Sequence, residues 1–291
     1  ETRKFANVAS MRSHGLEATI SSQNIRTKDF DWSTDLTYSY TKTKIKDVLS
    51  QANVIGLVYN SGSNIRKGYP HRSIFSIPFV GLNDEGIPQV INEKGEVTTT
   101  DINFQEYQNL GFLKYEGPTE PTMNGGLNNT LRYKNWRLNI FVTYSFGNKI
   151  RLDPTFSSSY SDMSAMPKEF KNRWVMPGDE KITSIPAIAS VRQYYNDTQL
   201  SFAYNSYNYS TERIADGGFI RLKDVSLTYD VPRSFLSKIG LSTAAIKLDA
   251  TNLCLLYADD KLNGQDPEFV NSGGVATPLS KQFTLTVRLG L

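Results

Sequence analysis

Apolar and polar residues alternate one by one at the end of the chain, in the stretch KQFTLTVRLGL. This pattern predicts a β-strand with one apolar and one polar face, because successive side chains of a strand point to opposite sides. The apolar side carries Phe283, Leu285, Val287, Leu289 and Leu291. Chain ends usually fray in water, so an apolar face that continues to the last residue predicts contact with something other than water.

The same alternation recurs in six further segments, whereas helical periodicity is almost absent. The expected strand cores are residues 13–22, 30–44, 125–134, 136–147, 216–230, 243–257 and 281–291. In FIRLKDVSLTYDV the apolar positions change phase between Leu222 and Val225. One extra residue in a strand produces such a change, so we predict a β-bulge near Lys223.

The connections between these strands alternate between short and long. The short ones are near residues 23–29, 134–136 and 232–242, and the long polar ones cover about residues 45–124, 148–215 and 258–280. Outer-membrane barrels have short periplasmic turns and long extracellular loops. We therefore predict an all-β fold in which residues 1–291 form the C-terminal strands of a large antiparallel transmembrane β-barrel, with the three long connections outside the cell.

The two faces of the predicted strands differ in the way that such a barrel requires. The polar face suits a wet lumen and carries Asp31, Asp35, Lys247, Asp249 and Arg288. The apolar face has amphipathic rings near strand ends, as in the aromatic girdles at lipid interfaces; these are Trp32, Tyr38, Tyr40, Tyr144 and Tyr229. The face of Leu291 is then expected against lipid. Because seven strands do not give an even count, we expect the rest of the barrel upstream.

Composition and charge exclude several other classes. The net charge of +3 is too small and too dispersed for a nucleic-acid partner. A single cysteine, Cys254, excludes an internal disulfide. The sequence contains no run of about 18 apolar residues, so no transmembrane helix is predicted. The chain opens with ETRKFANVAS, without an apolar signal region, so the signal of an exported protein is expected upstream.

Residues 217–256 resemble the C-terminal signature of SusC/RagA-type TonB-dependent outer-membrane transporters. The matching positions are Gly218, Ile220, Arg221, Leu222, Lys223, Val225, Leu227, Tyr229, Pro232, Leu236, Gly240, Asn252 and Leu253. GQDPE, from Gly264 to Glu268, resembles the last loop of that family. An N-terminal hairpin motif is met at Asn7, Gly15, Glu17, Phe30 and Trp32, whereas Ala9, His14 and Leu291 depart from the usual Gly, Asn and Phe.

The resemblance implies a 22-stranded barrel with a plugged lumen, in the outer membrane of a Gram-negative bacterium. It also implies a plug and a TonB-contacting segment upstream of this chain, energy from the TonB complex, and a SusD-type lipoprotein lid. The cargo of this family is oligosaccharide, or peptide in some members. A non-transporting structural or adhesive surface barrel and a soluble lectin-like β-domain remain as alternatives.

Catalytic and metal chemistry find little support in the sequence. Catalysis needs a nucleophile with a base, or two facing carboxylates, and neither His14, assigned to a polar strand face, nor His71, in a loop, has such a partner. We therefore expect no enzymatic activity and no cofactor. The acidic stretch YADDKLNGQDPE could offer oxygen ligands to Ca²⁺, but its spacing departs from a calcium loop, and a solvated turn is the competing interpretation.

The segment QYYNDTQLSFAYNSYNYS, residues 193–210, is dense in tyrosine and asparagine and falls in a long connection. Tyrosine offers a flat apolar face with a polar tip, and asparagine offers a donor and an acceptor, which together match the ring faces and hydroxyls of sugars. The predicted substrate-binding residues are Tyr194, Tyr195, Asn196, Tyr204 and Tyr207. Packing within the loop, contact with a lid and binding of peptide amides are the alternatives.

Overall fold

The computed structural model describes residues 9–49, 51–59, 65–160, 163, 165–197, 199–238, 240–270 and 278–290. Asn7 of the hairpin motif and Leu291, whose face was predicted to meet lipid, lie outside the described residues.

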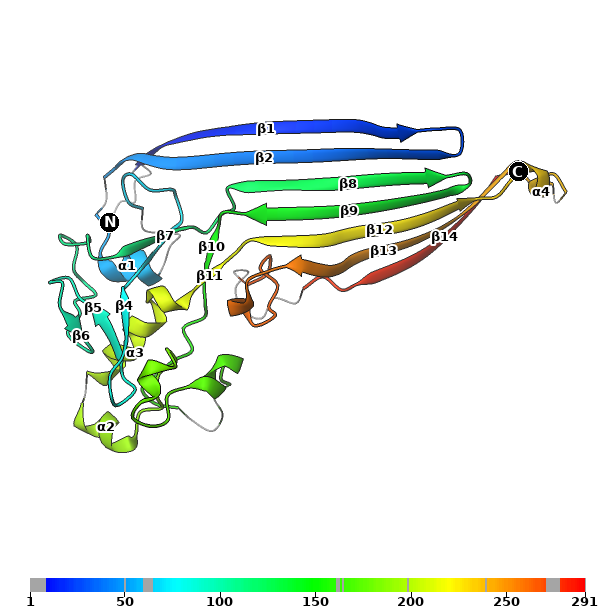
Figure 1. Cartoon of the computed structure of the whole chain (residues 1–291). Helices are drawn as coiled ribbons and strands as arrows, with labels where there is room; N and C mark the ends of the chain where they lie inside the picture. The colour runs from blue at the N-terminus through cyan, green and yellow to red at the C-terminus, as the bar shows by residue number, and fades with distance from the viewer. Residues whose placement is uncertain are drawn as a thin grey trace, which may run out of the picture.

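Seven long strands form one antiparallel sheet whose spatial order follows the order of the chain (Figure 1). This sheet is called the wall below. Its strands are β1 (Ala9–Arg26), β2 (Phe30–Val48), β8 (Met123–Tyr133), β9 (Trp136–Phe146), β12 (Phe219–Asp230), β13 (Thr243–Tyr257) and β14 (Gln282–Gly290). The seven predicted strands are thus all present. Figure 1 shows the short turns at one end of the wall and the three long connections at the other. These long connections, about residues 45–124, 148–215 and 258–280, are called the first, second and third excursion below.

The register of the wall aligns apolar residues with apolar residues across five strands. One such row consists of Leu131, Leu138, Leu227, Leu248 and Leu285. One position away, on the opposite face, the row consists of Thr130, Asn139, Ser226, Asp249 and Thr284. The predicted assignment of faces is therefore confirmed at this level of the sheet.

The predicted bulge at Lys223 is also confirmed. Leu222 and Asp224 pair with the consecutive residues Val142 and Phe141 of β9, which leaves Lys223 as the extra residue. Because the extra residue shifts the alternation by one position, Val225 lies on the same face as Leu222 although the two are three residues apart. The facing part of β13 is irregular as well, and Asn252 there has a left-handed backbone with φ of 54°, which asparagine tolerates better than most residues.

Aromatic side chains mark two levels of the apolar face. Near the short turns, the rings of Trp136 and Tyr229 are 4.6 Å apart. Near the excursions, the Tyr144 hydroxyl donates to the Thr37 carbonyl at 3.1 Å, and its ring occupies the space that a Cβ on Gly125 would need. From Trp136 to Tyr144 the strand rises about 27 Å, which covers most of a roughly 25 Å apolar band even when the strand is tilted.

The assignment of His14 to the polar face was wrong. His14 pairs with Lys42, and the residue two positions on, Leu16, pairs with Tyr40. His14 therefore lies on the apolar face with Leu16, on the part of β1 that extends past Tyr40 toward the excursions. The strands β1 and β2 continue past the last pair with β8, Tyr40 with Met123, so this hairpin extends further than its neighbours (Figure 1).

The long excursions contain folded structure of their own. The first holds α1 (Val54–Tyr59), β3 (Ser73–Ser76), β4 (Phe79–Leu82), β5 (Pro88–Ile91), β6 (Val97–Thr98) and β7 (Lys114–Pro118). The second holds β10 (Lys149–Arg151), η1 (Lys168–Asn172), η2 (Asp179–Lys181), α2 (Val191–Asn196), α3 (Leu200–Asn208), η3 (Thr211–Arg213) and β11 (Ile214–Asp216). The third holds η4 (Asp260–Leu262), and one short turn contains α4 (Arg233–Leu236).

The prediction that helices are almost absent is thus corrected, because the described chain contains four short α-helices. They escape a periodicity test because each has at most nine residues. None of the helices in the described ranges is both long enough and apolar enough to cross a membrane.

The buried hydrophobic clusters lie in the excursions, whereas the apolar face of the wall is bare. One cluster is built around Leu57, Phe75 and Ile77, and another around Tyr204 and Tyr207. By contrast, Leu248 is 55% exposed and Leu285 is 64% exposed. A bare apolar face of this extent agrees with a surface that meets lipid.

Candidate functional site

The first and second excursions are joined by backbone and buried side-chain contacts. Ile77 donates its N–H to the Tyr209 carbonyl and accepts from the Thr211 N–H, both at 3.0 Å. Arg151 of β10 donates from Nη2 to the Phe75 carbonyl at 2.6 Å and to the Ser76 hydroxyl at 3.1 Å. Burial lowers the pKa of Arg151 to about 10, so the guanidinium stays protonated at neutral pH.

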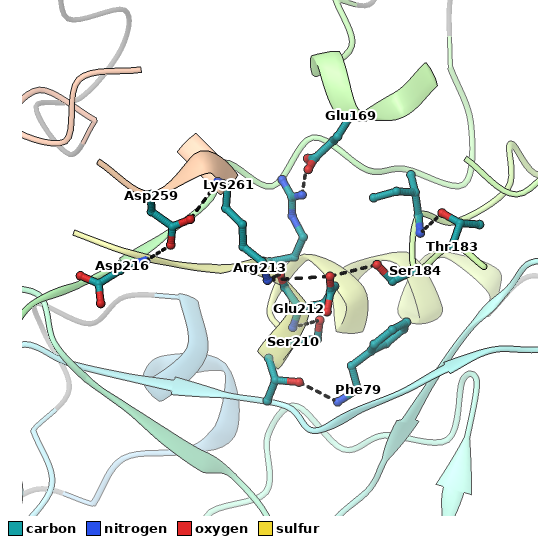
Figure 2. Close-up of polar contacts among 12 residues, drawn as sticks. Phe79, Glu169, Thr183, Ser184, Ser210, Glu212, Arg213, Asp216, Asp259 and Lys261 are labelled. Atoms are coloured by element: carbon teal, nitrogen blue, oxygen red, sulfur yellow. Dashed lines mark hydrogen bonds and ion pairs between the residues drawn. The ribbon is translucent and has the colours of Figure 1, made fainter. Parts of the chain in front are cut away.

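A polar network at the centre of the excursions includes residues from all three (Figure 2). Glu212 accepts from the Ser184 hydroxyl at 2.9 Å, and its carbonyl accepts from Lys261 Nζ at 3.2 Å. The neighbouring Thr211 hydroxyl accepts the N–H of Phe79, in the first excursion, at 3.2 Å. Arg213, which is 3% exposed, forms an ion pair with Glu169. We call this set the rim network.

The third excursion is held by a further bond of that network and by packing. Asp259 accepts the N–H of Asp216 at 2.6 Å and the N–H of Lys261 at 2.9 Å. Leu262 is buried in a cluster with Ile150 and Ala215. The three excursions therefore form one packed body at the end of the wall, which we call the loop assembly.

Arg221 attaches the third excursion to the polar face of the wall. Its Nη2 contacts both carboxylate oxygens of Asp266, at 2.6 and 2.7 Å, and Glu268 at 2.8 Å. Arg221 and Asp266 are only 5% and 7% exposed. The sequence did not predict that these two residues pair. Both lie in the motifs that carry the family resemblance, and this shared membership was the one available signal of a contact.

Three of the four carboxylates of the acidic stretch, those of Asp259, Asp266 and Glu268, have protein partners in this structure. Asp259 caps η4 and binds backbone N–H groups, whereas Asp266 and Glu268 bind a guanidinium. Within the described residues, no group of three or more side chains of the metal-binding types is close enough to hold a metal ion. The stretch is therefore a structured turn fastened to the wall rather than a purely solvated one.

Two of the five predicted binding residues lie inside the loop assembly. Tyr204 is 1% exposed, and its hydroxyl donates to the Ala187 carbonyl at 2.8 Å. Tyr207 is fully buried and packs edge-on against Phe79 and Phe156 at 5.5 and 5.0 Å. Burial raises the pKa of both hydroxyls. In this position, Tyr204 and Tyr207 have a packing role and present no ring to a ligand.

The other three predicted residues are accessible and lie together on the short helix α2. Tyr194 is 47% and Tyr195 is 76% exposed, and their rings are 5.8 Å apart at 75°. Asn196 beside them is also exposed. The helix begins with a capping box of Ser190 and Gln193, which fixes the direction in which the two rings leave the loop assembly.

The sequence resembles curated TonB-dependent receptors from Formosa agariphila. TonB-dependent receptor P3 is 26% identical over 297 residues, and TonB-dependent receptor P26 is 28% identical over 286 residues. These alignments cover 91% and 93% of this chain but only 26% and 27% of the relatives. The chain thus spans about a quarter of the length of the curated relatives it matches. No protein-family profile matches the chain.

Among solved structures, the fold resembles that of the RagAB transporter. The structure described as the RagAB peptide transporter has a TM-score of 0.70 with 22% identity, over 97% of this chain and 30% of the other. The RagAB peptide importer in the "open-open" state gives a TM-score of 0.71 with 21% identity. The described wall and loop assembly therefore have the fold of one part of that barrel, as predicted for an all-β barrel segment.

These relatives are named as receptors and transporters. The prediction of an antiparallel outer-membrane β-barrel, read from alternation and loop lengths, is confirmed by the register of the wall and by these neighbours. Together the comparisons confirm that the chain resembles SusC/RagA-type TonB-dependent outer-membrane transporters.

Proposed function

We propose that the chain is the C-terminal part of a TonB-dependent nutrient importer in the outer membrane. The observation that carries this proposal is the division of the wall into a bare apolar face and a polar face, with a folded loop assembly at only one end. Such a wall separates lipid from a polar lumen and has an elaborate mouth on one side. The relatives named as TonB-dependent receptors support the same reading.

In this proposal the long excursions, about residues 45–124, 148–215 and 258–280, are extracellular. A plug and a TonB-contacting segment lie upstream in the full protein, and a SusD-type lipoprotein covers the mouth. The plug receives energy from the TonB complex and cargo passes through the lumen. These partners follow from the family resemblance and belong to the whole protein.

We propose oligosaccharide as the cargo, with contact at the exposed side chains of Tyr194, Tyr195 and Asn196. Two adjacent accessible rings held by a capped helix give a surface on which sugar rings can stack, and the amide adds a donor and an acceptor. The RagAB structures are described as a peptide importer, which favours peptide as the second candidate.

The test is energised uptake by cells that carry the full-length transporter and its lid partner. Labelled oligosaccharides and labelled peptides are offered separately, with and without a functional TonB complex. TonB-dependent accumulation of either cargo supports import, and the cargo that accumulates decides between the two candidates. Equal, unenergised entry or no entry of both cargoes would favour a structural or adhesive barrel.

The cargo contact is tested with a Tyr194→Ala/Tyr195→Ala double variant at normal surface levels. Uptake and affinity should fall several-fold if both rings contact cargo. Arg192→Ala is a suitable control, since it alters an exposed residue of the same helix. Wild-type affinity in the double variant would exclude α2 from the binding surface.

A further inference from the structure

A second candidate contact site for cargo lies on the polar face of the wall, below the loop assembly. It is a pocket of about 510 Å³, within the roughly 300–1,000 Å³ range of small-molecule sites. Strands β8, β9 and β12 form its floor, and the third excursion forms one side. The residues that line it include Asn124, Thr143, Ser145, Lys223 and Glu268.

The bulge and the Arg221 ion pairs build the charged part of this pocket. Lys223 is the extra residue of β12 and is half-buried. Among the described residues, no carboxylate lies within ion-pair distance of its ammonium group. Glu268 is 40% exposed and is held by Arg221, so its carboxylate has a fixed position although it belongs to a loop.

The neutral part of the pocket comes from the regular strands. The Ser145 hydroxyl donates to Asn124 Oδ1 at 2.9 Å, which directs the amide N–H groups of Asn124 away from that bond. Thr143 pairs with Arg221 across the strands and adds a hydroxyl on the same face. The pocket therefore combines hydroxyl and amide groups with one ammonium and one carboxylate.

The charges of the pocket and its support sum to zero, since the two positive charges of Arg221 and Lys223 equal in number the two negative charges of Asp266 and Glu268. A neutral pocket with both donors and acceptors suits hydroxyl groups, which donate and accept at once. A peptide backbone is less well matched, because extended peptides usually bind by adding a strand to an open sheet edge. The strands under this pocket are central in the sheet and already paired on both sides.

We propose that this pocket is a lumenal subsite for a neutral oligosaccharide, with Lys223 and Glu268 as contact residues and Arg221 as the residue that positions Glu268. The proposal rests on the import function proposed above. It adds a contact site inside the wall to the exposed surface on α2, so that cargo meets polar groups after it has passed the mouth.

The experiment uses the full-length transporter purified with its lid partner. The probes are end-labelled short fragments of neutral glucan, xylan, mannan and galactan, and a tryptic digest of casein serves as the peptide arm. At least one glycan fragment should bind, and Lys223→Met should weaken its binding about tenfold, the loss of one charge-assisted hydrogen bond. Lys223→Arg should bind within about twofold of wild type, since it retains a cationic donor.

Lys67→Met is the matched control. It removes the same charge from a side chain that is 68% exposed and pairs with Asp47 in the first excursion, and its affinity should equal that of wild type. If Lys223→Met does not reach the membrane, Thr143→Val removes one pocket hydroxyl with little change in shape, and its affinity should fall several-fold.

Three results would overturn the subsite: wild-type affinity in both Lys223→Met and Thr143→Val, binding of casein peptides alone, or binding of no probe. Energised uptake by wild-type cells separates this failure from failure of the import function. Uptake that persists with unchanged variant affinities removes only the subsite, whereas wild-type cells without energised uptake contradict import itself.

Discussion

The wall and the loop assembly use hydrophobic residues in opposite ways. In the wall, apolar side chains such as Leu248 and Leu285 point outward and remain more than half exposed. In the loop assembly, apolar side chains such as Phe75 and Tyr207 are almost fully buried among one another. One chain therefore contains a part that needs lipid to cover it and a part that folds as a water-soluble protein does.

The two parts also satisfy their polar groups differently. The wall relies on the regular ladder of an antiparallel sheet, the arrangement that hydrocarbon surroundings require. The loop assembly relies on side chains that bridge segments far apart in the chain, as in the Arg151 contacts and the rim network. We therefore expect mutations in the wall to impair insertion and mutations in the loop assembly to impair only local order.

The largest effect is expected from removal of the last strand. Deleting residues 282–291 leaves β13 without the partner that it pairs with from Thr243 to Thr251. An unpaired edge in lipid costs several kcal/mol for each unsatisfied group, so the full-length protein should fail to assemble. Normal recovery of the deletion variant from outer membranes, measured by heat-modifiable migration on gels, would contradict this expectation.

A large but local effect is expected from Tyr207→Ala. The ring is fully buried and packs against Phe79 and Phe156, and loss of such an aromatic ring costs about 3–5 kcal/mol. Limited proteolysis of intact cells should show faster cleavage in the second excursion, while the amount of barrel in the membrane stays unchanged. The control is Tyr195→Ala, whose side chain is 76% exposed and whose cleavage rate should match wild type. A barrel lost together with the loop order would show that the two parts are not separable.

The apolar face is tested with Leu285→Lys and the polar face with Thr284→Lys. Leu285 lies in the leucine row of the apolar face, whereas Thr284 lies beside it on the opposite face. A lysine that faces lipid costs roughly 2–4 kcal/mol at the middle of the bilayer and less toward its surfaces, so folding into liposomes should suffer for Leu285→Lys and much less for Thr284→Lys. Equal damage by the two variants would reject the assignment of faces.

The smallest effect is expected from Lys261→Met in the rim network. The lysine is 47% exposed at its side chain, and its ion pair with Glu212 has a separation of 3.8 Å. Exposed pairs of this kind contribute about 0–1 kcal/mol. The rate of proteolysis in the third excursion should rise at most a few-fold, and less than in Arg221→Met, which leaves the buried Asp266 carboxylate without its guanidinium. A larger effect for Lys261→Met would place the main attachment of the third excursion in the rim network.

The wall was predictable from sequence because a period of two is a local property. The phase change between Leu222 and Val225 was sufficient to locate the bulge at Lys223. The face of His14 was assigned incorrectly because alternation alone gives no register, and only the pairing of Leu16 with Tyr40 shows which side of β1 is apolar. Register depends on the neighbouring strand, which the local pattern does not contain.

The interior of the loop assembly was not predictable in the same way. Tyr204 and Tyr207 look like exposed binding residues in a polar segment, yet α3 is packed on several sides by Ile87 and Phe156 from other segments. The bond between Arg221 and Asp266 joins residues 45 positions apart. Neither contact produces a periodic pattern in the sequence, because each depends on how segments far apart in the chain pack together.

The long β1–β2 hairpin gives the loop end of the wall an uneven edge. Beyond the last pair between β2 and β8, the hairpin continues from Thr41 to Val48, which adds about 27 Å of strand. Its far part is braced by the first excursion, since Ile45 is 2% exposed and exchanges backbone hydrogen bonds with Tyr69 and Gly68. The wall therefore continues on its β1 side as a stiff extension that stands beside the loop assembly instead of ending level with β8 (Figure 1).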